Sequence, residues 1–209
     1  MNKILVLAIF AVPLLIIQSC SSTAEDSHEN FKKTISQCNS CHSATASTPD
    51  NTPTLAGMDD QYLIEQLRNF RFDKRGTDSL SPVIQEMSRQ VKSLQENELP
   101  RIADYYKGLP IVNSTETVAG DINNGRALYT ANCEGCHSSA FGRFFTKSPK
   151  ISHLNGPYIF EQLTLFAANK RHFHVENKHK IKMIEVSKIF NNEELSDITA
   201  YIKSTKFVQ

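Results

Sequence analysis

A pentapeptide with two cysteines, two residues between them and a histidine directly after the second cysteine occurs twice. The copies are CNSCH at 38–42 and CEGCH at 133–137, and they start 95 positions apart. A zinc ribbon repeats its CxxC pair after about 15–20 residues, and a thioredoxin-type pair sits in a βαβ setting. Both copies here follow stretches with a helical polar–apolar pattern. Covalent haem attachment accounts for all three residues, because the thiols bond the porphyrin and the imidazole ligates its iron.

The sequence therefore predicts two haem c groups, one at each motif. A domain of under ~100 residues has a limited core, and a large flat cofactor fixed in it supplies much of the missing apolar surface. The predicted attachment and axial residues, in chain order, are Cys38, Cys41, His42, Cys133, Cys136 and His137.

The chain also repeats itself beyond the two haem motifs, which indicates a duplication with one haem in each copy. A shift of 96 residues superimposes matching residues, whereas the motifs themselves differ by 95, so a one-residue length change separates them from the rest. The matched positions are Pro53/Pro149, Tyr62/Tyr158, 65–67/161–163, Phe70/Phe166, 74–75/170–171, Met87/Met183, 98–99/194–195, Ile102/Ile198 and Tyr105/Tyr201.

The repeat selects the second axial ligand of each iron. Met87 and Met183 match each other, whereas the rival Met58 matches Leu154. A methionine thioether is a soft ligand that raises the reduction potential of haem iron. The second half also contains histidines with no histidine at the matched position, and we interpret them as surface residues: His153, His172, His174 and His179.

The remaining matched segments have the apolar spacing of helices, and no segment alternates as a strand does. These segments are 61–71, 98–108, 157–167 and 194–204. The sequence predicts an all-α protein of two tandem helical haem domains, at 31–110 and 121–209, joined by a linker at 111–120. The matched pairs Lys74–Arg75 and Lys170–Arg171 have two interpretations: counter-charges of haem propionates, or exposed helix-end charges.

The first 19 residues have the composition of an export signal, with Lys3 followed by an apolar run from Ile4 to Ile17. A membrane-spanning helix is the alternative, but it needs roughly 20 apolar residues. The sequence IQSC predicts a lipidated Cys20 at the start of the mature chain, which also explains the odd cysteine. Residues 20–30 are polar and are expected to form a flexible tether.

With these motifs assembled, the chain resembles the dihaem cytochromes c of the cytochrome c4 family over about residues 30–207. The segment PTLAGMDDQYLIEQLRNF (53–70) carries much of the likeness. The resemblance implies two cytochrome c-like domains, with His42 and Met87 on one iron and His137 and Met183 on the other. It also implies an electron carrier, not an enzyme, outside the cytoplasm, which passes electrons from respiratory donors towards terminal oxidases or similar acceptors. The second half departs from the family with PKISHLNG, and the first half lacks the Gly-x-x-Leu-Tyr of GRALY.

The charge of the chain bears on its partners. A formal net charge of +1 argues against a nucleic-acid surface, which needs a concentrated cationic excess. The first half, 24–112, sums to −3 and the second, 115–209, to +3. We expect redox proteins and, through the lipid anchor, a membrane as partners. The alternatives are a dihaem peroxidase-like or reductase enzyme, which needs an open iron position, and an electron-transfer subunit of a larger dehydrogenase or oxidase complex.

Overall fold

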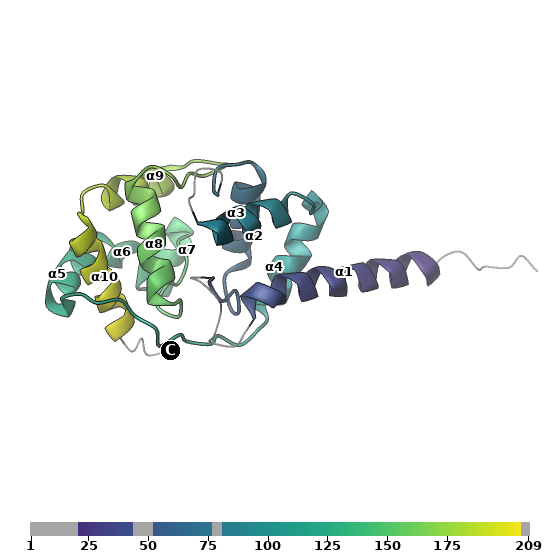
Figure 1. The fold of residues 1–209 in the computed structure, drawn as a ribbon, viewed down its shortest axis with the longest axis horizontal. Coiled ribbons are helices and arrows are strands. Elements are labelled where there is room, and N and C mark those ends of the chain that lie inside the picture. The colour runs from purple at the N-terminus through teal and green to yellow at the C-terminus, as the bar shows by residue number, and fades with distance from the viewer. Residues whose placement is uncertain (1–20, 44–51, 77–80, 206–209) are drawn as a thin grey trace, which may run out of the picture. The chain divides into compact units, whose positions relative to one another are not determined.

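The structure is a computed structural model that describes residues 21–43, 52–76 and 81–205 (Figure 1). It divides into two compact units, residues 1–37 and residues 38–209. The predictions for residues 1–19 and Cys20 lie outside the described residues. The helices are α1 (Ser21–His42), α2 (Asp60–Arg71), α3 (Pro82–Val91), the 3-10 helix η1 (Glu96–Glu98), α4 (Leu99–Lys107), α5 (Ile122–Asn132), α6 (Glu134–His137), α7 (Ala140–Thr146), α8 (Gly156–Ala167), α9 (Lys178–Ser187) and α10 (Asn192–Ser204).

The all-α prediction is confirmed for the described residues, in which the only β-type pairing is an isolated antiparallel bridge between Arg75 and Arg171. Helices cover all four segments in which apolar spacing predicted them: α2, α4, α8 and α10. Pro100 lies in the first turn of α4, where a missing N–H leaves no intrahelical bond unmade.

Residues 21–30, for which the sequence predicts a flexible tether, are instead helical and form the first part of α1. This stretch contains neither glycine nor proline, so nothing in it interrupts a helix that continues to His42. Propagation adds one backbone hydrogen bond for each residue that is fixed, which lets a helix extend into a polar segment once it is nucleated.

The two halves of the second unit, residues 38–110 and 121–205, use equivalent helices in equivalent ways. In the first half α2 packs against α3 and α4, and in the second half α8 packs against α9 and α10. The helices α2 and α8 begin alike, because Asp59 and Asn155, 96 residues apart, accept hydrogen bonds from the backbone N–H groups of Tyr62 and Tyr158 at 3.1 and 2.7 Å. The duplication therefore extends to the helix caps.

Helices α5 and α10, side by side in Figure 1, form the most extensive helix pair of the second half. Gly125 allows this close crossing, because a Cβ at its position would stand 2.0 Å from the carbonyl oxygen of Asp197. The carboxylate of Asp197 in turn accepts hydrogen bonds from the Asp121 backbone N–H at 2.6 Å and from Asn124 Nδ2 at 2.8 Å. The glycine of the GRALY segment is thus a packing residue.

The segment that joins the halves, residues 110–121, has no regular secondary structure. It is bonded along the second half: Ser114 N–H donates to the carbonyl of His153 at 3.0 Å, and Gly156 N–H donates to the carbonyl of Glu116 at 2.9 Å. Lys203 Nζ also donates to the Ser114 carbonyl at 2.8 Å. Among the described helices, none has both the length and the apolar character needed to cross a membrane.

Candidate haem site

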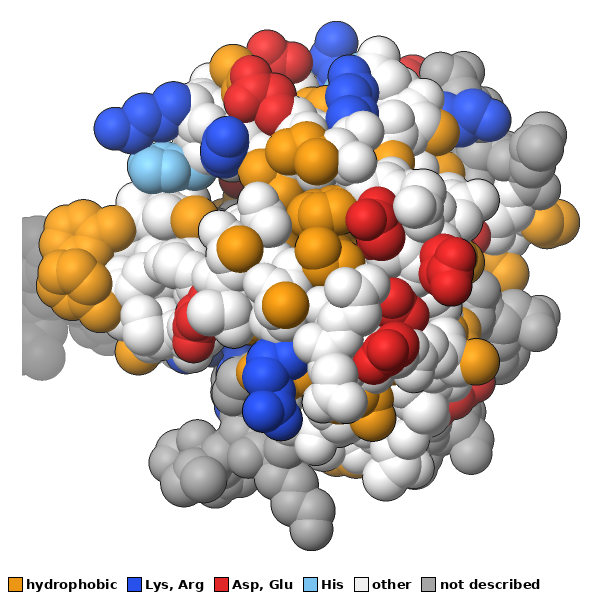
Figure 2. Space-filling view, turned by 90° about the vertical axis from the view of Figure 1, so that its left-hand side faces the viewer, with side chains coloured by type: hydrophobic (Ala, Val, Ile, Leu, Met, Phe, Trp, Pro, Cys, Tyr) orange, Lys and Arg blue, Asp and Glu red, His pale blue; other side chains and the backbone are white. Residues whose placement is uncertain are grey.

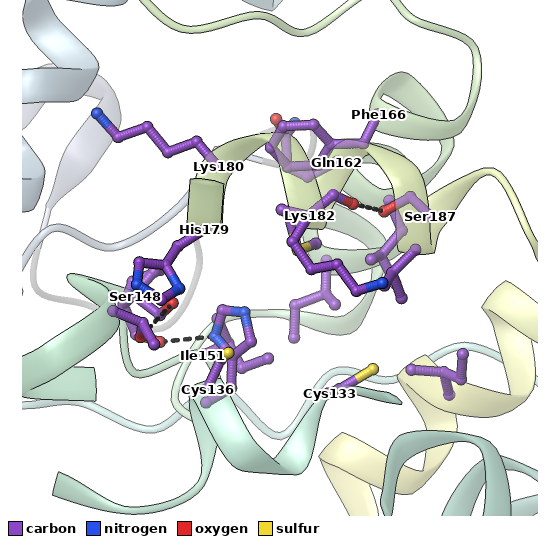
Figure 3. A pocket seen from close by; sticks show the side chains of 18 of the residues that line it. Cys133, Cys136, Ser148, Ile151, Gln162, Phe166, His179, Lys180, Lys182 and Ser187 are labelled. Atoms are coloured by element: carbon purple, nitrogen blue, oxygen red, sulfur yellow. Dashed lines mark hydrogen bonds between the residues drawn. The ribbon is translucent and has the colours of Figure 1, made fainter. Parts of the chain in front are cut away.

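The second half contains a cavity whose wall brings together four residues that the sequence assigned to one haem. Cys133, Cys136, His137 and Met183 all line it. In Figure 3 the two cysteines lie on one side of the cavity and Gln162 and Phe166 on the other. Much of the remaining wall is apolar and comes from α8 and α10, through Ile159, Leu163, Leu195, Ile198 and Ile202. Such a wall suits a flat aromatic ligand.

The local backbone explains how the motif presents its side chains. Helix α5 ends as Cys133 N–H donates to the carbonyl of Tyr129 at 2.8 Å, and a short turn of helix, α6, follows at once. The N–H groups of Cys136 and His137 then both donate to the Cys133 carbonyl, at 3.2 and 3.1 Å. This turn places both thiols and the imidazole on the same cavity.

The two motif histidines are held in the same way. Nδ1 of His42 lies 2.8 Å from the carbonyl oxygen of Pro53, and Nδ1 of His137 lies 3.0 Å from that of Pro149. A carbonyl oxygen only accepts, so Nδ1 of each ring carries the proton and Nε2 keeps its lone pair. Burial lowers the pKa of both imidazoles below the usual range, although the carbonyl bonds act in the opposite direction. Both are therefore neutral donors for a metal.

The thiols are not arranged for thiolate chemistry. Burial raises the pKa of Cys133 to about 12, with a smaller contribution from Cys136, and burial also raises the pKa of Cys38. A redox-active pair needs a lowered thiol pKa. No group of three or more histidine, cysteine or acidic side chains suited to a metal ion occurs among the described residues. The raised pKa values of Cys133 and Cys38 agree with the sequence argument against thiol exchange.

In the first half, the methionine that the sequence predicts as a ligand lies on the equivalent helix. Met87 lies on α3, as Met183 lies on α9. Met58, the rival, is buried with 5% of its surface exposed, and Leu154 at the matched position lines the cavity of the second half. Positions 50, 51 and 77, which match the lining residues Thr146, Lys147 and Phe173, fall outside the described residues.

The prediction that the four extra histidines are surface residues is wrong for His153. Its side chain is 1% exposed, and neither ring nitrogen has a hydrogen-bond partner. Burial lowers the pKa of His153 to about 4, with help from Lys150 and Lys203, so the ring is neutral and packs as an apolar group. His174 is exposed and stacks on Phe72.

His179, also predicted at the surface, lines the cavity, one helical turn before Met183 (Figure 3). Tyr62 and Glu65, from the first half of the chain, line the same cavity, and Glu65 forms an ion pair with Lys180 at 2.8 Å. Sequence reasoning missed these contributions from the first half, although Tyr62 and Glu65 both belong to the repeat.

A buried cluster of polar side chains connects the halves. Arg75 and Arg171 are 5% and 4% exposed, so their interpretation as exposed helix-end charges is wrong. Arg75 donates to Gln66 Oε1, Tyr158 OH and Gln162 Oε1, each at 2.9 Å. Arg171 makes the mirrored bonds, to Gln162 Oε1 at 2.9 Å, Tyr62 OH at 3.2 Å and Gln66 Oε1 at 3.0 Å. We call these six residues the arginine cluster.

The arginine cluster carries two positive charges with no acidic partner among the described residues. The Nε atoms of both arginines and the Nε2 atoms of both glutamines are buried without a hydrogen-bond partner. Burial, followed by repulsion from Arg75, lowers the pKa of Arg171. Arg171 also lines the cavity. Buried donors of this kind require acceptors, and the carboxylates of a haem supply both acceptors and negative charge, so the residues present fit the cofactor.

Comparisons with known proteins give a consistent result. Residues 122–206 match the family model described as "Cytochrome c". The cytochrome c4 of Pseudomonas aeruginosa is 26% identical over 97% of this chain and 98% of its own length. The structure of Acidithiobacillus ferrooxidans cytochrome c4 has a TM-score of 0.64 at 24% identity, over 81% of this chain and 99% of that one. The thiosulfate dehydrogenase TsdBA of Marichromatium purpuratum has a TM-score of 0.63 at 22% identity, over 81% of this chain and 36% of that one, which shows a shared fold.

Proposed function

The chain belongs to the dihaem cytochrome c4 family, and on that premise we propose that it carries single electrons between respiratory proteins outside the cytoplasm. The observation that supports this most directly is the second-half cavity. The thiols of Cys133 and Cys136, the imidazole of His137 and the thioether of Met183 all line it. Each bound haem supplies a one-electron iron couple. The role of the protein chain is to fix the ligands and to exclude water.

His42 and Met87 would hold one haem iron, and His137 and Met183 would hold the other. The carbonyls of Pro53 and Pro149 fix the tautomer and the orientation of the two imidazoles, which keeps Nε2 available in every state of the cycle. Thioether ligation favours the reduced iron. Attachment is through Cys38 and Cys41, and Cys133 and Cys136. With a histidine and a methionine on each iron, the chain would leave no open coordination position for a substrate.

The arginine cluster has a role in the same proposal. We assign its two guanidinium groups as hydrogen-bond donors to haem carboxylates, because each retains a buried Nε–H without a partner. The charges also favour the less positive, reduced state of nearby iron. The cluster includes Tyr62, Gln66 and Arg75 from the first half and Tyr158, Gln162 and Arg171 from the second, so it ties cofactor binding to the contact between the halves.

Replacement of each proposed ligand tests the function. In Met87→His and Met183→His variants, we expect the near-infrared band of methionine-ligated ferric haem to lose the contribution of one haem each. The matched control Met58→Leu, which installs the residue found at position 154, should leave that band unchanged. Haem quantitation should give two haems per chain in every variant.

Carbon monoxide binding tests whether either iron has an open coordination position. The reduced native protein should not bind it, because both irons have two protein ligands. Binding at either haem would indicate an open or displaceable position and would favour the peroxidase-like or reductase alternative.

We also propose export and lipid anchoring at Cys20, supported by the apolar run Ile4–Ile17 and the odd cysteine count. The native protein, expressed in a bacterium with lipoprotein processing, should fractionate with membranes. A Cys20→Ser variant should appear in the soluble fraction with its haems intact. Recovery of native protein in the soluble fraction, without an acyl mass on its N-terminal peptide, would contradict the anchor.

A further inference from the structure

Helix α7 exposes three phenylalanines close together. Phe141, Phe144 and Phe145 are 74%, 65% and 60% exposed. Their rings contact one another, with centroid distances of 4.5 Å between Phe141 and Phe145 and 5.3 Å between Phe144 and Phe145. Lys147 Nζ lies 4.5 Å from the centroid of the Phe144 ring. We call the side chains of Phe141, Phe144 and Phe145 the phenylalanine patch. Monomeric proteins rarely expose such a group without a function.

The patch stands on a rigid support fixed to the haem motif. Ser139 caps α7 by accepting from Gly142 N–H at 2.9 Å. Gly142 packs so closely that a Cβ there would lie 2.3 Å from the carbonyl oxygen of Gly135. Arg143 Nη1 donates to the carbonyls of His137 and Ser138 at 3.3 and 2.7 Å. The position of the patch relative to the CEGCH motif is therefore fixed by the backbone.

Haem retention does not account for the patch. None of the three phenylalanines lines the cavity, whereas Thr146, Lys147 and Ser148, directly after them, do. The matching stretch of the first half, SATASTPDNT at 43–52, contains no aromatic residue. One copy of the repeat thus has a haem motif without such a patch, and in the other copy the patch directly precedes residues that line the cavity.

Lys147 contacts the patch, and the stretch of sequence that carries the patch is rich in cationic side chains. From 135 to 160 the chain has no aspartate or glutamate, and it has Arg143, Lys147 and Lys150. Figure 2 shows hydrophobic side chains gathered at the left edge of the view, with Lys, Arg and His side chains above them. Aromatic side chains are enriched at the centres of protein interfaces, and charges around them steer an oppositely charged partner to the right face.

We propose that the phenylalanine patch is the docking surface for a redox protein with an acidic face around an apolar centre. The proposal rests on the electron-carrier function above. A partner seated on α7 lies against the segment that carries Cys136 and His137, so the electron path between the two proteins is short. An anionic membrane also attracts aromatic and cationic side chains. A redox protein is the favoured occupant because α7 is bonded to the haem motif through Arg143, and only a redox partner makes use of that position.

The test measures electron transfer from the reduced holoprotein to oxidised plastocyanin, an acidic blue-copper protein. The protein loses one electron and Cu(II) becomes Cu(I). We expect the second-order rate constant to fall about tenfold in Phe141→Ser/Phe144→Ser/Phe145→Ser and severalfold in Phe144→Ser. Phe72→Ser, at a phenylalanine 47% exposed and outside the patch, should match the native rate. Lys147→Glu should lower the rate and flatten its dependence on salt.

Two further measurements make the result decisive. Oxidation by ferricyanide, which needs no protein docking, should be nearly equal in the native protein, Phe72→Ser and the triple variant. A native protein that ferricyanide cannot oxidise would contradict the electron-carrier function itself. An unchanged plastocyanin rate in the triple variant would overturn the docking proposal. The docking proposal would also be overturned if the native protein and Phe72→Ser floated with anionic phosphatidylglycerol vesicles and the triple variant did not, since the patch would then bind lipid.

Discussion

Replacement of Arg171 by methionine in the haem-loaded protein removes one of the two buried guanidinium groups of the arginine cluster while keeping an apolar chain of similar length. Three hydrogen bonds are lost, to Gln162 Oε1, Tyr62 OH and Gln66 Oε1. Both glutamine oxygens keep a bond from Arg75, at 2.9 Å each. The Tyr62 hydroxyl has no such second bond from Arg75, so it loses its arginine donor altogether.

The size of the effect depends on whether haem carboxylates balance the charges. A hydrogen bond to a charged group contributes about 1.5–3 kcal/mol, and breaking a buried charge pair by removing one partner costs about 3–5 kcal/mol. Because two acceptors are shared with Arg75, we expect the lower end, a loss of about 3 kcal/mol in the free energy of unfolding. Without carboxylates, relief of the repulsion between Arg75 and Arg171 would offset the lost bonds, and the change would approach zero.

Urea unfolding of the holoprotein, followed by far-ultraviolet circular dichroism, measures the difference. The matched control is Arg68→Met, because Arg68 pairs with Glu96 at the surface, where the two side chains are 43% and 50% exposed. Exposed pairs contribute about 0–1 kcal/mol. An Arg171→Met protein with a full haem content and a loss no greater than that of Arg68→Met would refute the assignment. If the assignment holds, the haem midpoint potential of Arg171→Met should also be lower than that of the native protein, since a positive charge near the iron is removed.

Two other residues give independent predictions. Gly125→Ala should destabilise the second half by about 1–3 kcal/mol in thermal or urea unfolding, because the new methyl group would meet the Asp197 carbonyl at 2.0 Å. Gly135→Ala, whose Cβ would meet nothing within 4 Å, is the control, and an equal effect of both would contradict the packing argument. His153 has a folded-state pKa of about 4, below its ordinary 6.5, so the unfolded state binds more protons between these values and stability falls as the pH is lowered from 6.5 to 4. His153→Leu should remove roughly 2–3 kcal/mol of that fall, and an unchanged pH dependence of urea unfolding would show that His153 does not cause it.

The helices and the repeat were predictable because they depend on local periodicity. Residues such as Leu63, Leu67 and Phe70 are spaced for one helix face and are buried in the structure. The contacts of the motif histidines are also local, because each ring bonds a carbonyl only 11 or 12 positions further along the chain. Pro53 and Pro149, which match each other in the repeat, both accept a histidine Nδ1–H.

The arginine cluster was only half predictable. Two matched arginines indicate a shared role, but a charged side chain at a helix end is normally exposed. Burial of Arg75 and Arg171 follows from the contact of α2 with residues far along the chain, at separations of 83–109 positions. No short window of sequence contains that information. His153 is similar, because nothing near it in sequence predicts that a titratable ring will pack without a polar partner.

The divergence between the two halves indicates where partner specificity resides. The copies both retain the motif histidines, the helix caps Asp59 and Asn155, and the paired residues of the arginine cluster. Two copies that also had identical outer surfaces would present the same docking face twice. They differ instead in charge, −3 against +3, and in the aromatic helix α7, which only the second half contains among the described residues. Since charge and exposed aromatic area influence which proteins dock, we expect an acidic acceptor or donor to exchange electrons with the second haem, and a partner of different charge to exchange them with the first.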